Sequence, residues 1–325
     1  MTYTSRRGWR VLVAAGLPVL LSGAVAVAGS LARPLTAGFA DPAFQAVWQR
    51  TDLPVADHTV ARTWFWGPAP GGSLSEVYDE GPGHIHQVQY FDKSRMEINN
   101  PKGDPGSKWY VTNGLLSIEM ISGRVQLGNG RWLDKTRPPI GPATIPLASD
   151  IDDTNAPTYA SFTGLANTPL GDHKAADRTN QSVIDSVSRA GAVTQTPDKG
   201  SYAIRYARFE PLTGHNIAGV FWNFLTSRGP VRENGATREA QISDPWFFTS
   251  GLPISEAYWA RVKIAGAQHD VLIQCFERRV LTYIPDYPPE WRVQMANIGQ
   301  HYVQWRYEGG LPPPQPTAVN PLFTR

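Results

Sequence analysis

The chain has 325 residues, with 30 Lys or Arg, 28 Asp or Glu and a single Cys. A formal net charge of +2 excludes a strongly basic surface, so nucleic acid is not expected as a partner. One cysteine excludes an internal disulfide, so a hydrophobic core must stabilise the fold, and the length is sufficient for two domains.

The first 28 residues have the pattern of a secretory signal peptide. A short segment with three arginines precedes residues 11–28, which are all apolar, Gly, Pro or Ser. A basic start followed by an apolar stretch and small residues is typical of export signals. We expect cleavage after Ala28, and Ala40 marks a second small-residue site. A retained membrane anchor is the alternative, although Gly and Pro weaken this apolar stretch as a membrane span.

The N-terminal segment is compatible with two export routes. Residues 5–9, Ser-Arg-Arg-Gly-Trp, resemble a twin-arginine signal, which would carry a folded protein. The general secretory (Sec) route stays open because the match is partial. Cleavage after Ala28 removes three arginines and no acid, so the formal charge falls from +2 to −1. We expect a nearly neutral protein that is secreted or lies at the cell surface and contacts the membrane only through its export signal.

We expect a β-rich α+β protein in which two related helix-plus-β-hairpin units flank a small insert domain. The predicted parts are unit 1 at 42–128, a proline-rich linker at 129–157, the insert at 158–211, unit 2 at 212–308 and a proline-rich tail at 309–325.

The two units are predicted from a match between distant segments. Val88–Ile98 and Ile273–Tyr283 share a Gln, a Phe, an acid and a base in register. Matched aromatic motifs flank them at residues 64–66 and 246–248, and at residues 109–111 and 291–293. Self-similarity at similar spacing indicates two copies of one supersecondary unit.

Each unit is expected to begin with a helix and continue into strands. Apolar residues recur at helical spacing around Phe44 and Trp48, and again around Phe221 and Leu225. Gly-containing turns at residues 80–83 and 265–267 then predict one β-hairpin in each unit. Matched aromatic residues are expected to form a repeated core, namely Trp64, Trp246, Phe91 and Phe276.

Residues 258–264 alternate, which predicts a half-buried strand. Tyr258, Ala260, Val262 and Ile264 share one face, and Trp259, Arg261 and Lys263 share the other. An exposed tryptophan beside two basic residues can stack on a sugar ring. We therefore predict Trp259, Arg261 and Lys263 as the ligand-binding residues.

The second half resembles a known group of proteins. The segments that carry the likeness are residues 213–217, 246–259 and 275–283. They resemble the exported proteins common in filamentous and thermophilic Chloroflexi-type bacteria, whose repeats end in a Val-Gln-Tyr-Phe-type strand and are mostly of unassigned function. A weaker likeness, through Ser250–Ser255, is to the LGFP repeat of actinobacterial envelope proteins, and it implies attachment to a cell-wall polymer.

Other polar residues are expected to have structural roles. His84 and His86 lie two apart on a predicted strand and suit a metal pair, but Val271 occupies the position of His86 in unit 2, so we expect no metal and no cofactor. His215 is expected in a turn. Residues 150–155 are expected to form a solvated linker in preference to a calcium loop, and Cys275 to be a buried, inert thiol in preference to a nucleophile.

Catalytic signatures are absent from the sequence. It has no His-Glu-x-x-His, Gly-x-Ser-x-Gly or Ser-x-x-Lys motif and no glycine-rich phosphate loop. The carboxylates placed in matched regions are Asp92 with Glu97 and Glu277 with Asp286, and their sequence positions do not establish an acid/base pair.

We therefore expect a noncatalytic extracytoplasmic module that binds a cell-envelope or environmental polysaccharide through an aromatic and basic surface. An exported glycan or peptidoglycan hydrolase and a structural surface protein are the alternatives. The sequence leaves the oligomeric state open.

Overall fold

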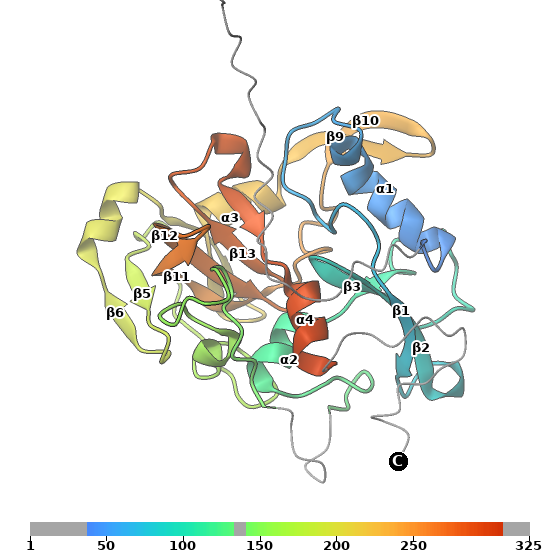
Figure 1. Cartoon of the computed structure of the whole chain (residues 1–325), viewed down its shortest axis with the longest axis horizontal. Helices are drawn as coiled ribbons and strands as arrows, with labels where there is room; N and C mark the ends of the chain where they lie inside the picture. The colour runs from blue at the N-terminus through green and yellow to red at the C-terminus, as the bar shows by residue number, and fades with distance from the viewer. Residues whose placement is uncertain (1–37, 133–140, 308–325) are drawn as a thin grey trace, which may run out of the picture.

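The computed structural model describes residues 38–132 and 141–307, so the predicted signal peptide and the proline-rich tail lie outside the described residues. The fold is β-rich with a few helices, at 21% helix and 32% strand, which confirms the predicted β-rich α+β class (Figure 1). No helix in the described ranges is both long and apolar enough to cross a membrane.

The first half forms a four-stranded antiparallel sheet in chain order, flanked by two helices. Helix α1 begins where Asp41 accepts a hydrogen bond from the Ala43 N–H and Pro42 takes the first helical position. The elements are α1 (Pro42–Ala56), β1 (Ser73–Val77), η1 (Pro82–His84), β2 (Ile85–Phe91), β3 (Ser94–Ile98), β4 (Thr112–Asn113) and α2 (Leu116–Ser122).

The middle of the chain is integrated into the rest of the fold. Ala143, Leu147 and Ala156, from the predicted linker, are buried in the core. Strand β5 pairs in parallel with β11, so the predicted insert shares a sheet with the second half. Its elements are η2 (Tyr159–Phe162), β5 (Asp185–Val187), β6 (Val193–Gln195), η3 (Pro197–Tyr202) and β7 (Tyr206–Glu210).

The second half contains the larger sheet, with the strand order β14-β13-β12-β11-β5-β6. The turn between β11 and β12 places Ala265 and Gly266 at φ of 50° and 80°, and this left-handed pair makes the predicted tight hairpin. The elements are β8 (His215–Ala218), α3 (Gly219–Leu225), β9 (Arg228–Glu233), β10 (Ala236–Gln241), β11 (Pro253–Ile264), β12 (Ala267–Phe276), β13 (Val280–Tyr283), η4 (Pro289–Trp291), β14 (Val293–Met295) and α4 (Ile298–Arg306).

Apolar residues form two large cores, and alternate residues of β11 enter different ones. Tyr258 and Val262 pack in the core that contains the apolar residues of α2 and α4. Trp259 packs in the core that contains those of α1 and α3. Strand β11 is therefore covered on both faces along most of its length.

Helices α2 and α4 connect the two halves reciprocally, and Figure 1 shows them side by side near the centre of the molecule. The Gln300 N–H of α4 donates to the Asp92 carbonyl at 3.2 Å, in the turn between β2 and β3. The Ile118 N–H of α2 donates to the Glu277 carbonyl at 3.4 Å, in the turn between β12 and β13. Each helix thus uses a free first-turn N–H to bind the hairpin turn of the other half.

Two buried glutamines make equivalent hydrogen bonds. Gln89 of β2 and Gln274 of β12 are fully buried, and each amide nitrogen donates to two backbone carbonyls. Each amide oxygen accepts from the backbone N–H of an alanine. The partners are Gly38, Gly71 and Ala40 for Gln89, and Asn216, Ser255 and Ala218 for Gln274.

A buried ionic cluster lies between the first sheet and α2 and α4. Arg95 binds Glu97 at 2.6 Å, Glu119 at 3.1 Å and Glu76 at 3.4 Å, and Arg306 binds Glu76 at 2.6 Å. Burial alone would raise the pKa of Glu76, but the two arginines hold it well below its usual range. Burial raises the pKa of Glu119 despite the nearby arginines. Glu76 is therefore the carboxylate that contributes most to balancing the positive charges of Arg95 and Arg306.

Replacement of these two acids should have unequal effects on stability. Glu76→Gln removes the buried carboxylate that both Arg95 and Arg306 contact, and should lower the free energy of unfolding by about 3–5 kcal/mol at pH 7, where the contribution of a carboxylate with a lowered pKa is fully present. Glu119→Gln should cost less than about 1.5 kcal/mol. Urea unfolding measures both variants, and equal losses would contradict this charge assignment.

The pH dependence of the Glu119→Gln variant gives a second readout. A carboxyl with a raised pKa contributes stability below its unfolded value of 4.5, and this contribution is lost as the pH rises through the folded pKa. The glutamine does not titrate, so the variant should gain stability relative to the natural protein as the pH rises from 4 towards 8. A constant difference across that range would contradict the raised pKa.

Candidate functional site

The predicted exposure of Trp259 is wrong. Its side chain is 0% exposed, its indole N–H donates to the Val183 carbonyl at 2.8 Å, and its ring stacks on Tyr202 at 4.6 Å. The alternation of β11 is as predicted, but the segment around Val183 and Tyr202 covers the face that carries Trp259. Trp259 therefore packs in the core and is not available to a ligand.

Arg261 and Lys263 have structural partners at the end of the hairpin. The Arg261 side chain is 59% exposed and lies 3.3 Å from Asp270. Lys263 binds Asp152 at 2.7 Å, and its backbone N–H donates to Asp153 at 2.7 Å. With Trp259 buried, the three predicted binding residues do not form one binding surface.

The acidic loop predicted as a solvated linker binds this same hairpin. The two carboxylate oxygens of Asp150 accept the Ala265 and Gly266 N–H groups, each at 2.9 Å. The carboxylates at 150 and 153 thus bind backbone N–H groups of the turn and the strand before it. These bonds fix the loop on the β11–β12 turn. The loop therefore has a structural role that differs from both the predicted solvated linker and the alternative calcium loop.

The two predicted strand histidines have separate partners. His86 Nδ1 lies 2.6 Å from Asn99 Oδ1, and its ring stacks on Tyr78 at 4.5 Å. His84 Nδ1 lies 3.1 Å from the Asp79 carbonyl. Within residues 38–132 and 141–307, no group of three or more His, Cys, Asp or Glu residues is placed to hold a metal ion.

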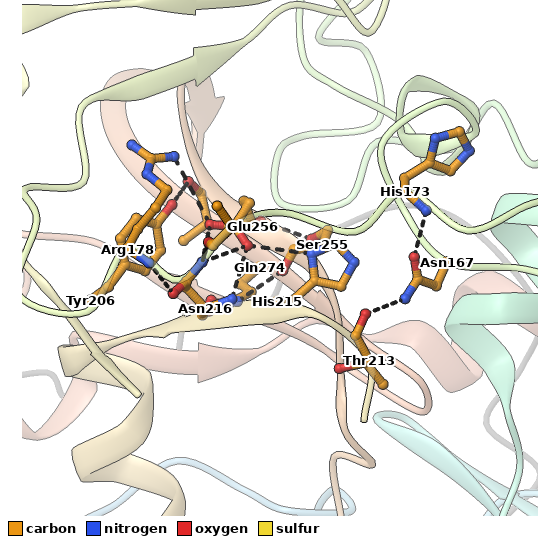
Figure 2. A network of polar contacts seen from close by, with 12 residues as sticks. Asn167, His173, Arg178, Tyr206, Thr213, His215, Asn216, Ser255, Glu256 and Gln274 are labelled. Atoms are coloured by element: carbon orange, nitrogen blue, oxygen red, sulfur yellow. Dashed lines mark hydrogen bonds and ion pairs between the residues drawn. The ribbon is translucent and has the colours of Figure 1, made fainter. Parts of the chain in front are cut away.

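His215 belongs to a buried polar network rather than to a turn. Figure 2 shows His215 and Asn216, at the start of β8, pointing towards Glu256 of β11. His215 Nδ1 lies 3.3 Å from the Glu256 carboxylate, which also accepts the Asn216 N–H at 2.9 Å. Arg178 lies 3.9 Å from the same carboxylate and binds Asp185 at 2.6 Å. This network fixes β8 and the segment around Arg178 on β11.

The remaining reactive groups also have structural environments. Cys275 is buried as predicted, and burial raises the pKa of its thiol well above its usual range, which makes it a poor nucleophile. The four matched carboxylates each bind a different group. Asp92 binds the Gln300 side chain, Glu97 binds Arg95, Glu277 binds the Leu252 N–H and Asp286 binds His269.

A row of aromatic side chains at the surface is the best candidate for a functional site. We define the aromatic strip as Trp109, Phe247, Trp246 and Trp222. Trp109 is 50% exposed and the other three are partly exposed. Successive ring centroids are 6.2, 5.4 and 5.3 Å apart. The Arg208 guanidinium lies over two of these rings, 5.0 Å from the Trp222 centroid and 5.9 Å from the Trp246 centroid.

Two loops from different halves and helix α3, which carries Trp222, build this strip. Trp109 ends a turn-rich loop in which Asp104 and Ser107 accept backbone N–H groups at 2.8 and 3.2 Å. The other loop carries Trp246 and Phe247. The Phe248 carbonyl fixes it by accepting hydrogen bonds from Asn113 at 3.1 Å and from Arg278 at 2.7 Å. Tertiary contacts between the halves therefore place Trp109 beside Phe247.

A polar hollow of about 180 Å³ lies beside Trp109. It is lined by Asn99, Asn100, Gly103, Asp104, Ser107, Trp109, Tyr110 and Thr112. A larger hollow of about 320 Å³ lies over β1 and β2, and among the described residues no Trp, Tyr or Phe lines it. The first hollow adjoins the strip and combines an aromatic ring with hydroxyl, amide and carboxylate groups, as sites for small polar ligands do.

Sequence reasoning treated Trp109 only as half of a repeated motif. The signal that could have identified it is its position after Pro101-Lys-Gly-Asp-Pro-Gly-Ser-Lys108. A stretch this rich in turn residues and charges lies at the surface, so its tryptophan is expected to be exposed. Trp246 was assigned to the repeated core, and it packs against the core while remaining partly exposed.

Replacement of Trp259 and of Trp109 by alanine should have very different effects on the free energy of unfolding. Trp259→Ala removes a fully buried ring and should lower the free energy of unfolding by about 3–5 kcal/mol. Trp109→Ala removes a half-exposed ring and should cost at most about 1.5 kcal/mol. Arg261→Ala is the surface control, at about 1 kcal/mol or less. Denaturant unfolding measures all three, and a small loss for Trp259→Ala would contradict its burial.

Comparisons with known proteins assign this chain to no family. No family model, curated protein or solved structure matches the chain. The resemblance to exported repeat proteins therefore stays a prediction from the sequence. The aromatic strip and its polar hollow are the features from which a function is inferred.

Proposed function

We propose that this chain is a noncatalytic extracytoplasmic module that binds a polysaccharide along the aromatic strip. The observation that carries the proposal is the series of ring contacts from Trp109 to Trp222, with the Arg208 guanidinium over the Trp222 and Trp246 rings. Export by the N-terminal segment and a polymer of the cell envelope or the environment as partner are part of this proposal.

The spacing of the rings supports a polymer over a single small ligand. Sugar rings present flat C–H faces that pack on aromatic side chains, which provide a large contact area at low entropic cost. Centroid spacings of 5.3–6.2 Å are comparable with the length of one sugar unit, so consecutive units can each contact a ring. The Trp109 and Phe247 planes differ by 16°, whereas Trp246 meets both Phe247, at 85°, and Trp222, at 69°, edge to face, so a bound chain has to turn at Trp246.

The partners of the neighbouring acids favour binding over hydrolysis. Asp244 pairs with Lys108 at 2.9 Å, and Asp104 accepts the Gly106 N–H at 2.8 Å. Glycoside hydrolysis requires two carboxyl groups that face each other across the scissile bond. Acids whose partners are a lysine and a turn N–H are better suited to holding the loops of the strip.

We also propose that the two halves are related units. Each half has a helix, four antiparallel strands paired in chain order and a second helix, although the second half also has the β9–β10 hairpin after α3. This shared order, the equivalent hydrogen bonds of Gln89 and Gln274 and the reciprocal contacts of Ile118 and Gln300 support the relation. Under this proposal the strip lies where the two units meet, because Trp109 belongs to one unit and the other three rings to the second.

Removal of the most exposed ring tests the proposed function. The natural protein should be retained on at least one insoluble or immobilised polysaccharide in a panel of cell wall, cellulose, chitin, xylan and β-glucan. Trp109→Ala should weaken this retention about two- to tenfold, because one aromatic contact is worth about 0.5–1.5 kcal/mol. Affinity electrophoresis gives the dissociation constants for the soluble members of the panel.

The matched control is Trp291→Ala. Trp291 is also partly exposed, and within the described ranges it makes no ring contact with the strip. Its replacement should leave retention unchanged. Absence of retention on every polymer, or equal losses for Trp109→Ala and Trp291→Ala, would overturn the proposed function.

A further inference from the structure

The polar side chains of the hollow beside Trp109 differ in how many of their hydrogen-bonding atoms are already bound to other residues. Asn99 is committed, since its amide donates to Thr112 at 3.3 Å and its oxygen lies 2.6 Å from His86. Asn100 accepts the Lys102 N–H at 3.2 Å through its oxygen only. In the described part of the chain, the Asn100 amide nitrogen has no hydrogen-bond acceptor, so its two N–H groups are available to a ligand.

Asp104 and Ser107 retain hydrogen-bonding capacity as well. Asp104 Oδ1 accepts the Gly106 N–H at 2.8 Å, while Oδ2 accepts no hydrogen bond from any residue in the described ranges. Ser107 Oγ accepts the Trp109 N–H at 3.2 Å and keeps its own proton for donation. The hollow thus presents free donors and one strong acceptor next to an exposed aromatic face.

The charge of the hollow restricts its ligand. No Lys or Arg lines it, and Asp104 contributes one negative charge. An acidic sugar would place its carboxylate or sulfate near this carboxylate, which is unfavourable. Of the two basic residues in the same loop, Lys108 already pairs with Asp244 at 2.9 Å and Lys102 lies outside the lining. A neutral sugar can instead donate a hydroxyl to Asp104 Oδ2 and accept from the Asn100 amide, and bonds to a charged acceptor are the stronger type.

We propose that this hollow is the specificity subsite of the strip and binds an uncharged sugar ring through two neighbouring hydroxyl groups. Asp104 and Asn100 bind the hydroxyls and Trp109 packs on the ring. This inference rests on the proposed function and deepens it, since it names neutral glycans as the ligand class. Binding should therefore depend little on ionic strength.

Two substitutions test the subsite. The probes are hexasaccharides of cellulose, xylan, chitin and β-1,3-glucan as neutral ligands, and hexagalacturonic acid as the acidic one, measured by calorimetry at 50 and 500 mM salt. Asn100→Ala should weaken binding of the preferred neutral hexasaccharide about tenfold, and Asp104→Asn should do the same, because each removes one hydrogen bond to the sugar. Asp104→Asn should also strengthen binding of the acidic hexasaccharide, because the repelling charge is gone.

The following controls distinguish failure of the subsite from failure of the proposed polysaccharide binding. Asparagine forms the same type of turn as aspartate, so Asp104→Asn should unfold at the same denaturant concentration as the natural protein. Unchanged affinity of both variants for a polymer whose retention requires Trp109 would overturn the subsite and leave the proposed function intact. Preferential, salt-sensitive binding of hexagalacturonic acid by the natural protein would overturn the neutral ligand class. Failure of every probe and of every polymer would overturn both proposals.

Discussion

The reciprocal contact between helix N-termini and hairpin turns is the constraint on which the rest of the molecule depends. The third residue of α2 binds the β12–β13 turn, and the third residue of α4 binds the β2–β3 turn. The approach at α4 is so close that a Cβ on Gly299 would overlap the Phe91 carbonyl oxygen. Glycine at this position is what lets the helix contact the turn.

This contact also creates the candidate site. Asn113, three residues before the start of α2, donates to the Phe248 carbonyl. The loop before Asn113 carries Trp109, and the segment before Phe248 carries Trp246 and Phe247. Fixing α2 on the second half therefore brings one exposed tryptophan beside a pair of rings that lie more than a hundred residues away. The strip is a product of tertiary structure and could not form in either half alone.

Local patterns in the sequence predicted the helices and strands well. They did not predict which faces are buried, because burial depends on whether a distant segment covers the face. The alternation in 258–264 and the glycine turn at 266 fixed the β11–β12 hairpin and its two faces. Exposure of the second face depended on whether another segment covered it. Val183 and Tyr202 cover it, and no local pattern around Trp259 reports a contact with residues more than fifty positions away. The reverse holds for Trp109, whose turn-rich surroundings did indicate exposure.

The most direct measurement of the central claim is an NMR titration that follows the indole N–H signals, assigned by single Trp→Phe variants, as the preferred polymer or hexasaccharide is added. Binding along the strip predicts shifts for Trp109, Trp246 and Trp222. The Trp259 signal should stay fixed, because its N–H is buried against the Val183 carbonyl. Shifts confined to Trp259 or Trp291, with Trp109 unchanged, would contradict the account.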